Sequence, residues 1–327
     1  MMNKHSPKFT LLLLLAFIAA CQAPFKTDDD KSDDPITTQD SLGPSGITRA
    51  IQQDKQGNIW IASWEGIFKY DGNYFTHITS EVSLSRFFSV LADSKGTFWF
   101  GSIGSGAYYY DGNSFRNYIS NDGLANDSVH FIYEAKSGHV WFATQGGVSF
   151  YDGTSFHSFT TQDGLADNDV IAVAEDNNGI IWIGTNAGIS LYDGITFTDF
   201  TTEQGLSFQN VRSIITDMNG DVWIGGQRGL WRYDGITLSN ISTQFVGYIY
   251  EDNQGNIWAS SVGALGWEVI RYDKNPLFQA SLTATKIWAS GDMVFGISKD
   301  STGMLWFGTL HGVCQYDGMT VNCLNRD

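Results

Sequence analysis

The sequence is poor in proline, in basic residues and in long apolar segments. Only 5 of its 327 residues are proline, against 36 glycines, 11 tryptophans and 14% aromatic residues. Few prolines beside many glycines and aromatics favour short strands joined by tight turns over disorder. The length leaves one large domain or two small ones open.

Basic residues are scarce as well. The chain has 19 Lys and Arg against 35 Asp and Glu, a formal net charge of −16. A surface of this sign repels a phosphate backbone, so we expect no nucleic acid partner. Direct electrostatic attraction to an anionic membrane surface is disfavoured for the same reason.

The longest apolar run lies at the start of the chain. Basic residues Lys4 and Lys8 precede a mostly apolar segment, 9–20, that is too short to span a bilayer as a helix. It ends in the letters IAAC, which resemble the lipobox of bacterial lipoproteins. The resemblance implies a signal peptide over residues 1–20, cleavage before Cys21 and lipid on Cys21. An ordinary secretory signal is the alternative. We expect a lipid-anchored protein of the cell envelope, on the periplasmic or surface side of the outer membrane.

Residues 21–45 predict an acidic, flexible tether. Five aspartates lie between Asp28 and Asp34, and apolar residues are few. Such a segment cannot bury a core of its own. We therefore expect the folded part to begin at residue 46.

A repeat with a mean period of 41 residues fills the remainder. Its two markers are a tryptophan within an apolar strand pattern and the aspartate of a Tyr-Asp turn. The markers are Trp60, Trp99, Trp141, Trp182, Trp223, Trp258 and Trp306, and Asp71, Asp111, Asp152, Asp193, Asp234, Asp273 and Asp317. Each copy holds four short strand patterns, which residues 169–202 illustrate. The sequence predicts an all-β fold, a seven-bladed β-propeller of four-stranded antiparallel blades over 46–327, with the tryptophans packed between blades.

The repeated letters resemble a known family. The pattern D-x-x-G-x-x-W-x-G-T-x-x-G-[ILV]-x-x-Y-D-G-x-x-F is carried by Asp176, Gly179, Trp182, Gly184, Thr185, Gly188, Tyr192, Asp193, Gly194 and Phe197. It is similar to the two-component regulator propeller repeat, and the resemblance covers roughly residues 46–325. It implies a periplasmic sensor propeller of the kind found in membrane histidine kinases that respond to glycans. No kinase, response-regulator or transmembrane segment accompanies the repeats, so we expect the propeller alone, as a stand-alone lipoprotein. The sixth copy departs from the pattern, with Lys274 in place of the turn glycine.

The connections between strands differ in how strictly they repeat. In up-and-down blades, the Asp-x-x-Gly and Tyr-Asp-Gly turns share one face, and we expect this face to be scaffold. The loops of the other face vary between copies, so a ligand is expected there. Amide, charged and aromatic side chains on that face suit a glycan or a peptide. The candidate binding residues are Trp64, Glu65, Arg86, Asn126, Gln145, Asn168, Asn186, Phe208, Asn210, Gln227, Arg228, Trp288 and His311. The insertion around Trp288 is expected to form a lip over the pocket.

Two of the three cysteines flank the last Tyr-Asp-Gly turn. If Tyr316 pairs with Val321, then Cys314 lies directly opposite Cys323. Opposed strand residues come close enough for a disulfide, and an exported protein meets an oxidising environment. We expect a bridge that staples the last blade, with two free thiols as the alternative.

Other chemistry finds little support in the sequence. The six histidines show no metal-ligand spacing, and the Asp-x-x-Gly turns lack the ligands that calcium requires. We therefore expect no metal and no cofactor. The turns differ from a sialidase Asp-box by one residue of spacing, and no arginine triad can be assigned among eight arginines, so glycosidase chemistry is not expected.

Three functional hypotheses follow. The leading one is a lipid-anchored, non-enzymatic module that binds a glycan or peptide and acts with a membrane sensor or uptake protein. The second is a lyase resembling virginiamycin B lyase, which needs a His and a Glu on the loop face; His311 and Glu65 are the candidates. The third is a surface scaffold that binds other proteins.

Overall fold

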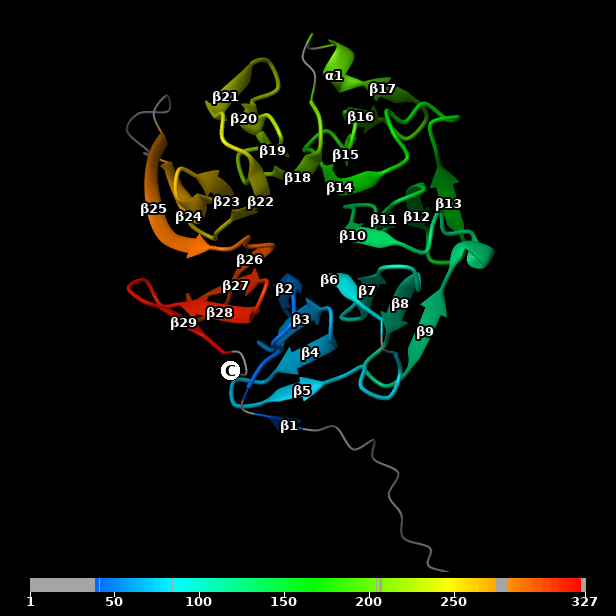
Figure 1. The fold of residues 1–327 in the computed structure, drawn as a ribbon. Helices are drawn as coiled ribbons and strands as arrows, with labels where there is room; N and C mark the ends of the chain where they lie inside the picture. The colour runs from blue at the N-terminus through cyan, green and yellow to red at the C-terminus, as the bar shows by residue number, and fades with distance from the viewer. Residues whose placement is uncertain are drawn as a thin grey trace, which may run out of the picture. The chain divides into compact units, whose positions relative to one another are not determined.

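Seven antiparallel sheets follow one another around a central axis in the computed structural model (Figure 1). The structure describes residues 39–40, 42–83, 85–203, 205, 208–274 and 282–324. The first strand of each sheet contacts the first strand of the next, and β26 contacts β2, which closes the ring. The predicted seven-bladed propeller is confirmed. The predicted signal peptide, Cys21 and the first part of the tether lie outside the described residues.

Each blade is built from four consecutive strands, ordered from the axis outward. The first strands are β2 (Thr48–Gln53), β6 (Phe87–Ala92), β10 (Val129–Glu134), β14 (Val170–Glu175), β18 (Val211–Thr216), β22 (Val246–Glu251) and β26 (Gly296–Lys299). The second strands are β3 (Ile59–Ser63), β7 (Phe98–Ser102), β11 (Val140–Thr144), β15 (Ile181–Thr185), β19 (Val222–Gly226), β23 (Ile257–Gly263) and β27 (Leu305–Thr309).

The third and fourth strands complete the blades. The third strands are β4 (Gly66–Tyr70), β8 (Ala107–Tyr110), β12 (Gly147–Tyr151), β16 (Ile189–Tyr192), β20 (Gly229–Tyr233), β24 (Gly266–Lys274) and β28 (Gly312–Tyr316). The fourth are β5 (Phe75–His77), β9 (Phe115–Tyr118), β13 (Phe156–Phe159), β17 (Phe197–Asp199), β21 (Leu238–Ser242), β25 (Leu282–Gly291) and β29 (Val321–Cys323). Between blades the described chain forms a 3-10 turn at Ser120–Asp122 and one short helix, α1 (Phe200–Glu203).

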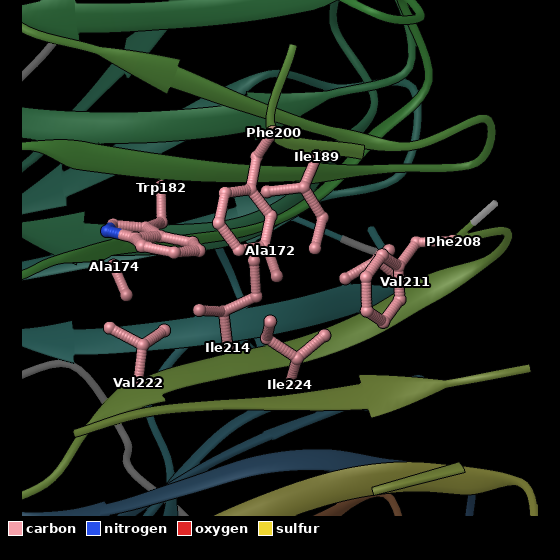
Figure 2. Close-up of a cluster of buried hydrophobic side chains, with 10 residues drawn as sticks. All are labelled: Ala172, Ala174, Trp182, Ile189, Phe200, Phe208, Val211, Ile214, Val222 and Ile224. Carbon is pink, nitrogen blue, oxygen red and sulfur yellow. The ribbon is translucent and has the colours of Figure 1, made fainter. Parts of the chain in front are cut away.

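The core lies between the faces of neighbouring blades. Every residue of β15 is buried, because the sheets on either side cover both of its faces. Figure 2 shows one such layer, in which Trp182 and Phe200 of one blade meet Ile214 and Val222 of the next. The repeat tryptophans therefore pack between blades, as predicted.

The Asp-x-x-Gly turns are tied to these tryptophans. In blade four, Asp176 Oδ1 accepts hydrogen bonds from the backbone N–H groups of Asn178 and Ile180 at 2.8 and 3.0 Å. Its Oδ2 accepts the indole N–H of Trp182 at 3.2 Å. Five blades repeat this aspartate–tryptophan pair. One carboxylate thus closes the turn and satisfies a buried donor, which turn propensity alone does not reveal.

The Tyr-Asp-Gly turns are closed by their own side chains. Asp193 Oδ1 accepts the N–H groups of Ile195 and Thr196, and the Tyr192 hydroxyl donates to the Gly194 carbonyl at 2.9 Å. Six blades contain this arrangement. All of its polar groups are used locally, which supports a scaffold role for this face.

Side chains at the ends of first strands accept hydrogen bonds from the Asp-x-x-Gly turn of the preceding blade. Glu134 at the end of β10 accepts the N–H of Ser94 at 2.7 Å and its hydroxyl at 2.6 Å. The same contact joins the last blade to the first, where Gln53 accepts the N–H of Ser301 at 2.8 Å. Ring closure therefore reuses an inter-blade contact found elsewhere in the ring.

The predicted start of the folded part at residue 46 is too late. A short strand, β1 (Gln39–Asp40), pairs with β5 as a fifth strand of the first blade. Gly43 is buried, and its N–H donates to the Leu324 carbonyl at 2.7 Å. The end of the expected tether therefore bridges the first and last blades, because their exposed backbone groups need partners.

The sixth blade differs from the expected turn and lip. β24 and β25 continue their pairing as far as Lys274 and Leu282, so the hairpin is longer than in the other blades. The inserted residues extend the outer strand, and Trp288 lies within that strand. The expectation of a lip at this insertion is therefore wrong.

Candidate functional site

The variable loops gather at one end of the first strands. The turn between the second and third strands begins beside the residue that precedes each first strand. Trp64 N–H donates to the Ile47 carbonyl at 2.9 Å, and Asn186 N–H donates to the Asp169 carbonyl at 3.0 Å. This face therefore surrounds one mouth of the central channel, which confirms the predicted division between the two faces.

The channel contains a cavity of about 600 Å³ lined by first-strand residues of all seven blades. This volume is within the range of small-molecule sites. Near the variable face, each blade contributes one residue, which is the second residue of the first strand in six blades and directly precedes β26 in the seventh. These seven lining residues are Arg49, Phe88, His130, Ile171, Arg212, Gly247 and Phe295.

A β-bulge explains why this position is free to vary. Thr48 pairs with Ser63 and Ala50 pairs with Ala62, so Arg49 between them has no partner on β3. Six first strands contain the same register shift. Bulges are frequent near active sites, where they redirect a side chain. Here they bring a ring of side chains that differ from blade to blade to the channel mouth.

Arg49 is the most enclosed cation of this ring. Its Cζ lies 4.2 Å from the ring centroid of Phe88 and 4.4 Å from that of Phe295. Burial, followed by the positive charge of Arg212, lowers the pKa of Arg49 to about 10. Its guanidinium has no hydrogen bond or ion pair with any residue that the structure describes. The two rings stabilise the charge by cation–π attraction without neutralising it.

Arg212, His130 and Asp169 form the polar part of the same mouth. Burial lowers the pKa of Arg212, and the carboxylate charge of Asp169 opposes this. Burial also lowers the pKa of His130. The Val170 carbonyl, which lies 3.0 Å from its Nδ1, acts in the opposite direction and raises this pKa. Oδ1 of Asp169 lies 3.6 Å from the same nitrogen and is buried without a hydrogen-bond partner in the described chain. The mouth therefore combines two guanidinium groups with one carboxylate.

An aromatic side adjoins Arg49. The ring of Trp64 lies nearly parallel to that of Phe88, at 6.4 Å between centroids. The guanidinium of Arg86 lies over the ring of Trp64, with its Cζ 4.6 Å from the ring centroid. The indole nitrogen of Trp64 is buried and lacks a hydrogen-bond partner among the described residues. Of the sequence-predicted residues, Trp64 and Arg86 thus belong to the surroundings of the mouth.

The other predicted polar residues divide into three groups. Gln145 lines the cavity itself. Asn186, Gln227 and Arg228 are exposed at turn tips on the same face. The predicted loop asparagines bind within their own loops. Asn126 accepts the N–H of Ser128, Asn168 accepts that of Thr161, and Asn210 accepts from Arg212 Nη1 at 3.4 Å.

Glu65 and His311 have separate partners. Glu65 accepts the hydroxyl of Ser45 at 2.7 Å and its N–H at 3.2 Å. His311 Nε2 lies 3.4 Å from Asp292 Oδ2. No group of three His, Cys, Asp or Glu side chains is placed to hold a metal ion in the described residues. In the described structure, the side-chain partner of Glu65 is thus Ser45, and that of His311 is Asp292.

Two predicted aromatic residues are packing residues. Phe208 is 3% exposed and contacts the ring of Trp231 in the core between blades four and five. Trp288 stacks on Phe307 at 5.6 Å between centroids, in the layer between the last two blades. Phe208 lies in the loop before β18, as expected, but its ring is buried, whereas Trp288 lies in β25, and neither residue lines the cavity.

The candidates named from the sequence did not include Arg49, His130, Asp169 or Arg212. They were taken from the loops, whereas three of these residues lie on first strands and Asp169 directly precedes β14. Aligning the seven copies at the bulge would have revealed a position occupied by Arg, Phe, His, Ile, Arg, Gly and Phe. No fold requirement explains that variety.

The last hairpin has the register that the cysteine spacing predicted. Cys314 pairs with Cys323 and Tyr316 with Val321. A disulfide joins the two cysteines, with 1.99 Å between the sulfurs. It lies at the outer edge of the seventh blade, away from the residues that line the cavity.

The repeats match a known family. The sequence profile of the two component regulator propeller matches residues 41–65, 123–146, 164–187, 205–228 and 240–263. No curated protein matches the sequence significantly. Among the described helices, none has the length and apolar character needed to cross a membrane.

Solved structures share the fold. The extracellular domain of the hybrid two-component system BT3049 from B. thetaiotaomicron is 23% identical with a TM-score of 0.71, over 84% of this chain and 39% of that chain. The extracellular domain of the one-component system BT4673 from B. thetaiotaomicron is 17% identical with a TM-score of 0.61, over 85% and 49%. Virginiamycin B lyase from Staphylococcus aureus is 14% identical with a TM-score of 0.65, over 84% and 96%. This chain thus spans less than half of either B. thetaiotaomicron chain, and at these identities the likeness establishes the fold alone.

Proposed function

Because the chain carries two-component regulator propeller repeats, we propose that it is an extracytoplasmic ligand-binding module of the sensor type. The observation that carries this proposal is the cavity of about 600 Å³, whose mouth is ringed by residues that differ from blade to blade, six of them at the bulge position of a first strand. The fold requires a bulge at this position but does not determine which residue occupies it. Such freedom is expected where side chains are selected for a ligand.

The ligand is a glycan or a peptide bound at the variable face. Trp64 and Phe88 offer rings for stacking, and Gln145 offers an amide inside the cavity. Asn186 and Gln227 add exposed amides around it. Rings and amides together match the apolar faces and hydroxyl or amide groups of such ligands.

The proposed role is binding rather than catalysis. This proposal is supported by the contacts of the two candidate catalytic groups, since Glu65 accepts a hydrogen bond from Ser45 and His311 lies beside Asp292. Ligand binding would be signalled to a membrane sensor, or the ligand would be delivered to a membrane uptake protein. We further propose that residues 1–20 are a signal peptide and that lipid on Cys21 anchors the protein in the cell envelope.

A binding screen tests the ligand proposal. The full-length protein, purified in detergent, is challenged with panels of oligosaccharides and short peptides while its melting temperature is recorded. A true ligand at a hundred times its dissociation constant stabilises by about 2.7 kcal/mol, which is readily measured. Stabilisation by a saccharide or a peptide is expected. A response to neither class, with a stoichiometric protein partner recovered instead, favours the scaffold and overturns the proposal.

The anchor is tested separately. Intact mass and membrane fractionation are compared for the natural chain and Cys21→Ser. We expect the natural chain to carry acyl groups and to sediment with membranes, and Cys21→Ser to be released. Equal fractionation of both proteins without acyl mass would contradict lipid anchoring.

A further inference from the structure

The channel mouth is a positive site in an acidic protein. The chain has a formal net charge of −16, yet two of its eight arginines line one cavity. The charges of Arg49 and Arg212 are close enough for one to lower the pKa of the other. Asp169 is the only carboxylate among the described lining residues. A cavity of this kind concentrates anions locally, whatever the net charge of the protein.

The charge of Arg49 is uncompensated within the described protein. Its guanidinium lies between Phe88 and Phe295 and has no carboxylate partner. A buried cation without a partner costs free energy, so its retention calls for a function. Guanidinium groups bind planar or tetrahedral oxyanions through paired hydrogen bonds, and such bonds are among the strong ones in proteins. An oxyanion of the ligand would supply the missing charge.

The remaining groups favour a sugar over a peptide as the carrier of that anion. Oδ1 of Asp169 is buried without a hydrogen-bond donor and suits a hydroxyl group. The rings of Trp64 and Phe88 provide a flat apolar surface beside Arg49. A peptide carboxylate would use the arginines but would bring few hydroxyl donors for Asp169.

We propose that the channel mouth binds an acidic saccharide, with its carboxylate or sulfate held by Arg49 and Arg212 and a hydroxyl donated to Asp169. This inference rests on the proposed binding function and specifies its ligand class. His130 lines the same cavity as the two arginines that would hold the carboxylate or sulfate. In the free protein its pKa is lowered by burial and by the two arginines.

Calorimetry with four probes tests the proposal on the full-length protein. The probes are trigalacturonate, a disaccharide whose only charged group is one sulfate, an uncharged trisaccharide and triglutamate. We expect binding of at least one of the first two, which also identifies the oxyanion, and no binding of the last two. Arg49→Met and Arg212→Gln should each weaken binding at least tenfold. Arg116→Gln is the matched control, because Arg116 stacks on Tyr118 in an outer strand, and it should change affinity less than twofold.

The unliganded proteins provide a second readout. If Arg49 is kept for a ligand, Arg49→Met removes an uncompensated buried charge and leaves the melting temperature unchanged or higher. If its contacts with Phe88 and Phe295 are only structural, the same substitution lowers the melting temperature. That result, with unchanged affinity, would overturn the inference.

The outcomes separate the two proposals. Binding of the uncharged trisaccharide with equal affinity in all three variants overturns the acidic ligand and leaves the binding function intact. Binding of triglutamate alone overturns the saccharide in the same way. If none of the four probes binds and the broader saccharide and peptide screen gives no response, both the acidic-saccharide inference and the proposed binding function are overturned.

Discussion

The indole N–H of Trp223 donates a hydrogen bond of 2.7 Å to Oδ2 of Asp217, and both side chains are buried. Oδ1 of the same carboxylate accepts the backbone N–H groups of Asn219 and Asp221 at 2.8 and 3.1 Å. One side chain therefore joins the turn at the scaffold face to the layer between two blades. The spacing of Asp, Gly and Trp in the repeat follows from this contact.

Replacing this aspartate should be costly. Asp217→Ala leaves the Trp223 indole and two backbone donors without their acceptor, and unsatisfied buried donors cost about 1–3 kcal/mol. We expect a loss of about 2–3 kcal/mol in chemical denaturation, and a smaller loss for Asp217→Asn, which keeps acceptor oxygen. Equal losses for both variants would contradict the hydrogen-bond explanation.

The third blade offers the reverse experiment. Its turn has Ala135 at the aspartate position, yet Gly138 N–H still donates to the Ala135 carbonyl at 2.8 Å, as in the other turns. Ala135→Asp should place a carboxylate below the Trp141 indole. We expect a gain of about 1 kcal/mol, typical of restoring a repeat consensus. A loss of stability would show that this blade has adapted to the absence of the carboxylate.

The glycine two residues after the repeat tryptophan reflects close packing between blades. A Cβ added to Gly225 would lie 2.8 Å from Val246 Cγ1 and 3.0 Å from Ile249 Cδ1, both on the next blade. We expect Gly225→Ala to cost about 1–3 kcal/mol through overpacking. The control is Ala143→Gly at the same position of blade three, where the cost should stay near 0.5–1 kcal/mol. Denaturation midpoints that rank the other way would refute this packing argument.

The blades could be predicted because each copy specifies its own turns and pairing. The register of Cys314 with Cys323 followed from counting residues across one hairpin, since a local turn sets that register. The contact of Gly43 with Leu324 was not predictable in this way, because it joins opposite ends of the repeat array. Residues 39–45 contain neither the tryptophan nor the Tyr-Asp marker of the repeat, so the segment was assigned to the tether.

The site was only partly predictable, for a related reason. Loop variability directed attention to one face and to Gln145, which lines the cavity, and Trp64, which lies beside Phe88. It missed Arg49 and Arg212 because these residues lie on first strands rather than in loops. Phe208 was misassigned because burial between blades depends on the neighbouring blade.

The disulfide should stabilise the seventh blade. Cys314 and Cys323 are separated by 9 residues, and a loop of this size gives about 2–3 kcal/mol in the chain-entropy estimate. We expect the combined Cys314→Ser and Cys323→Ser variant to unfold at lower denaturant concentration. A reducing agent should lower the stability of the natural chain and leave the variant unchanged. Thiol titration showing two reactive cysteines in the unreduced, unfolded chain would contradict the bridge.

Acid should destabilise the propeller through its Tyr-Asp-Gly turns. The aspartates of these turns whose pKa lies below the ordinary value of 3.8 are Asp71, Asp111, Asp152, Asp193, Asp234 and Asp317. In Asp317 the backbone N–H of Thr320 is the main cause, followed by that of Met319. In Asp152 the Thr154 hydroxyl comes first.

The sign of the effect follows from these lowered pKa values. The unfolded chain takes up protons first as the pH falls, so stability from these groups is present above the ordinary pKa and is lost below it. We expect melting temperatures to be insensitive to these groups above about pH 5 and to fall steadily from about pH 4 downward. Asp317→Asn should reduce the slope below about pH 4, because Asn closes the same turn without titrating. A melting temperature that stays constant to about pH 3, or an unchanged slope in the variant, would rule out this origin of acid sensitivity.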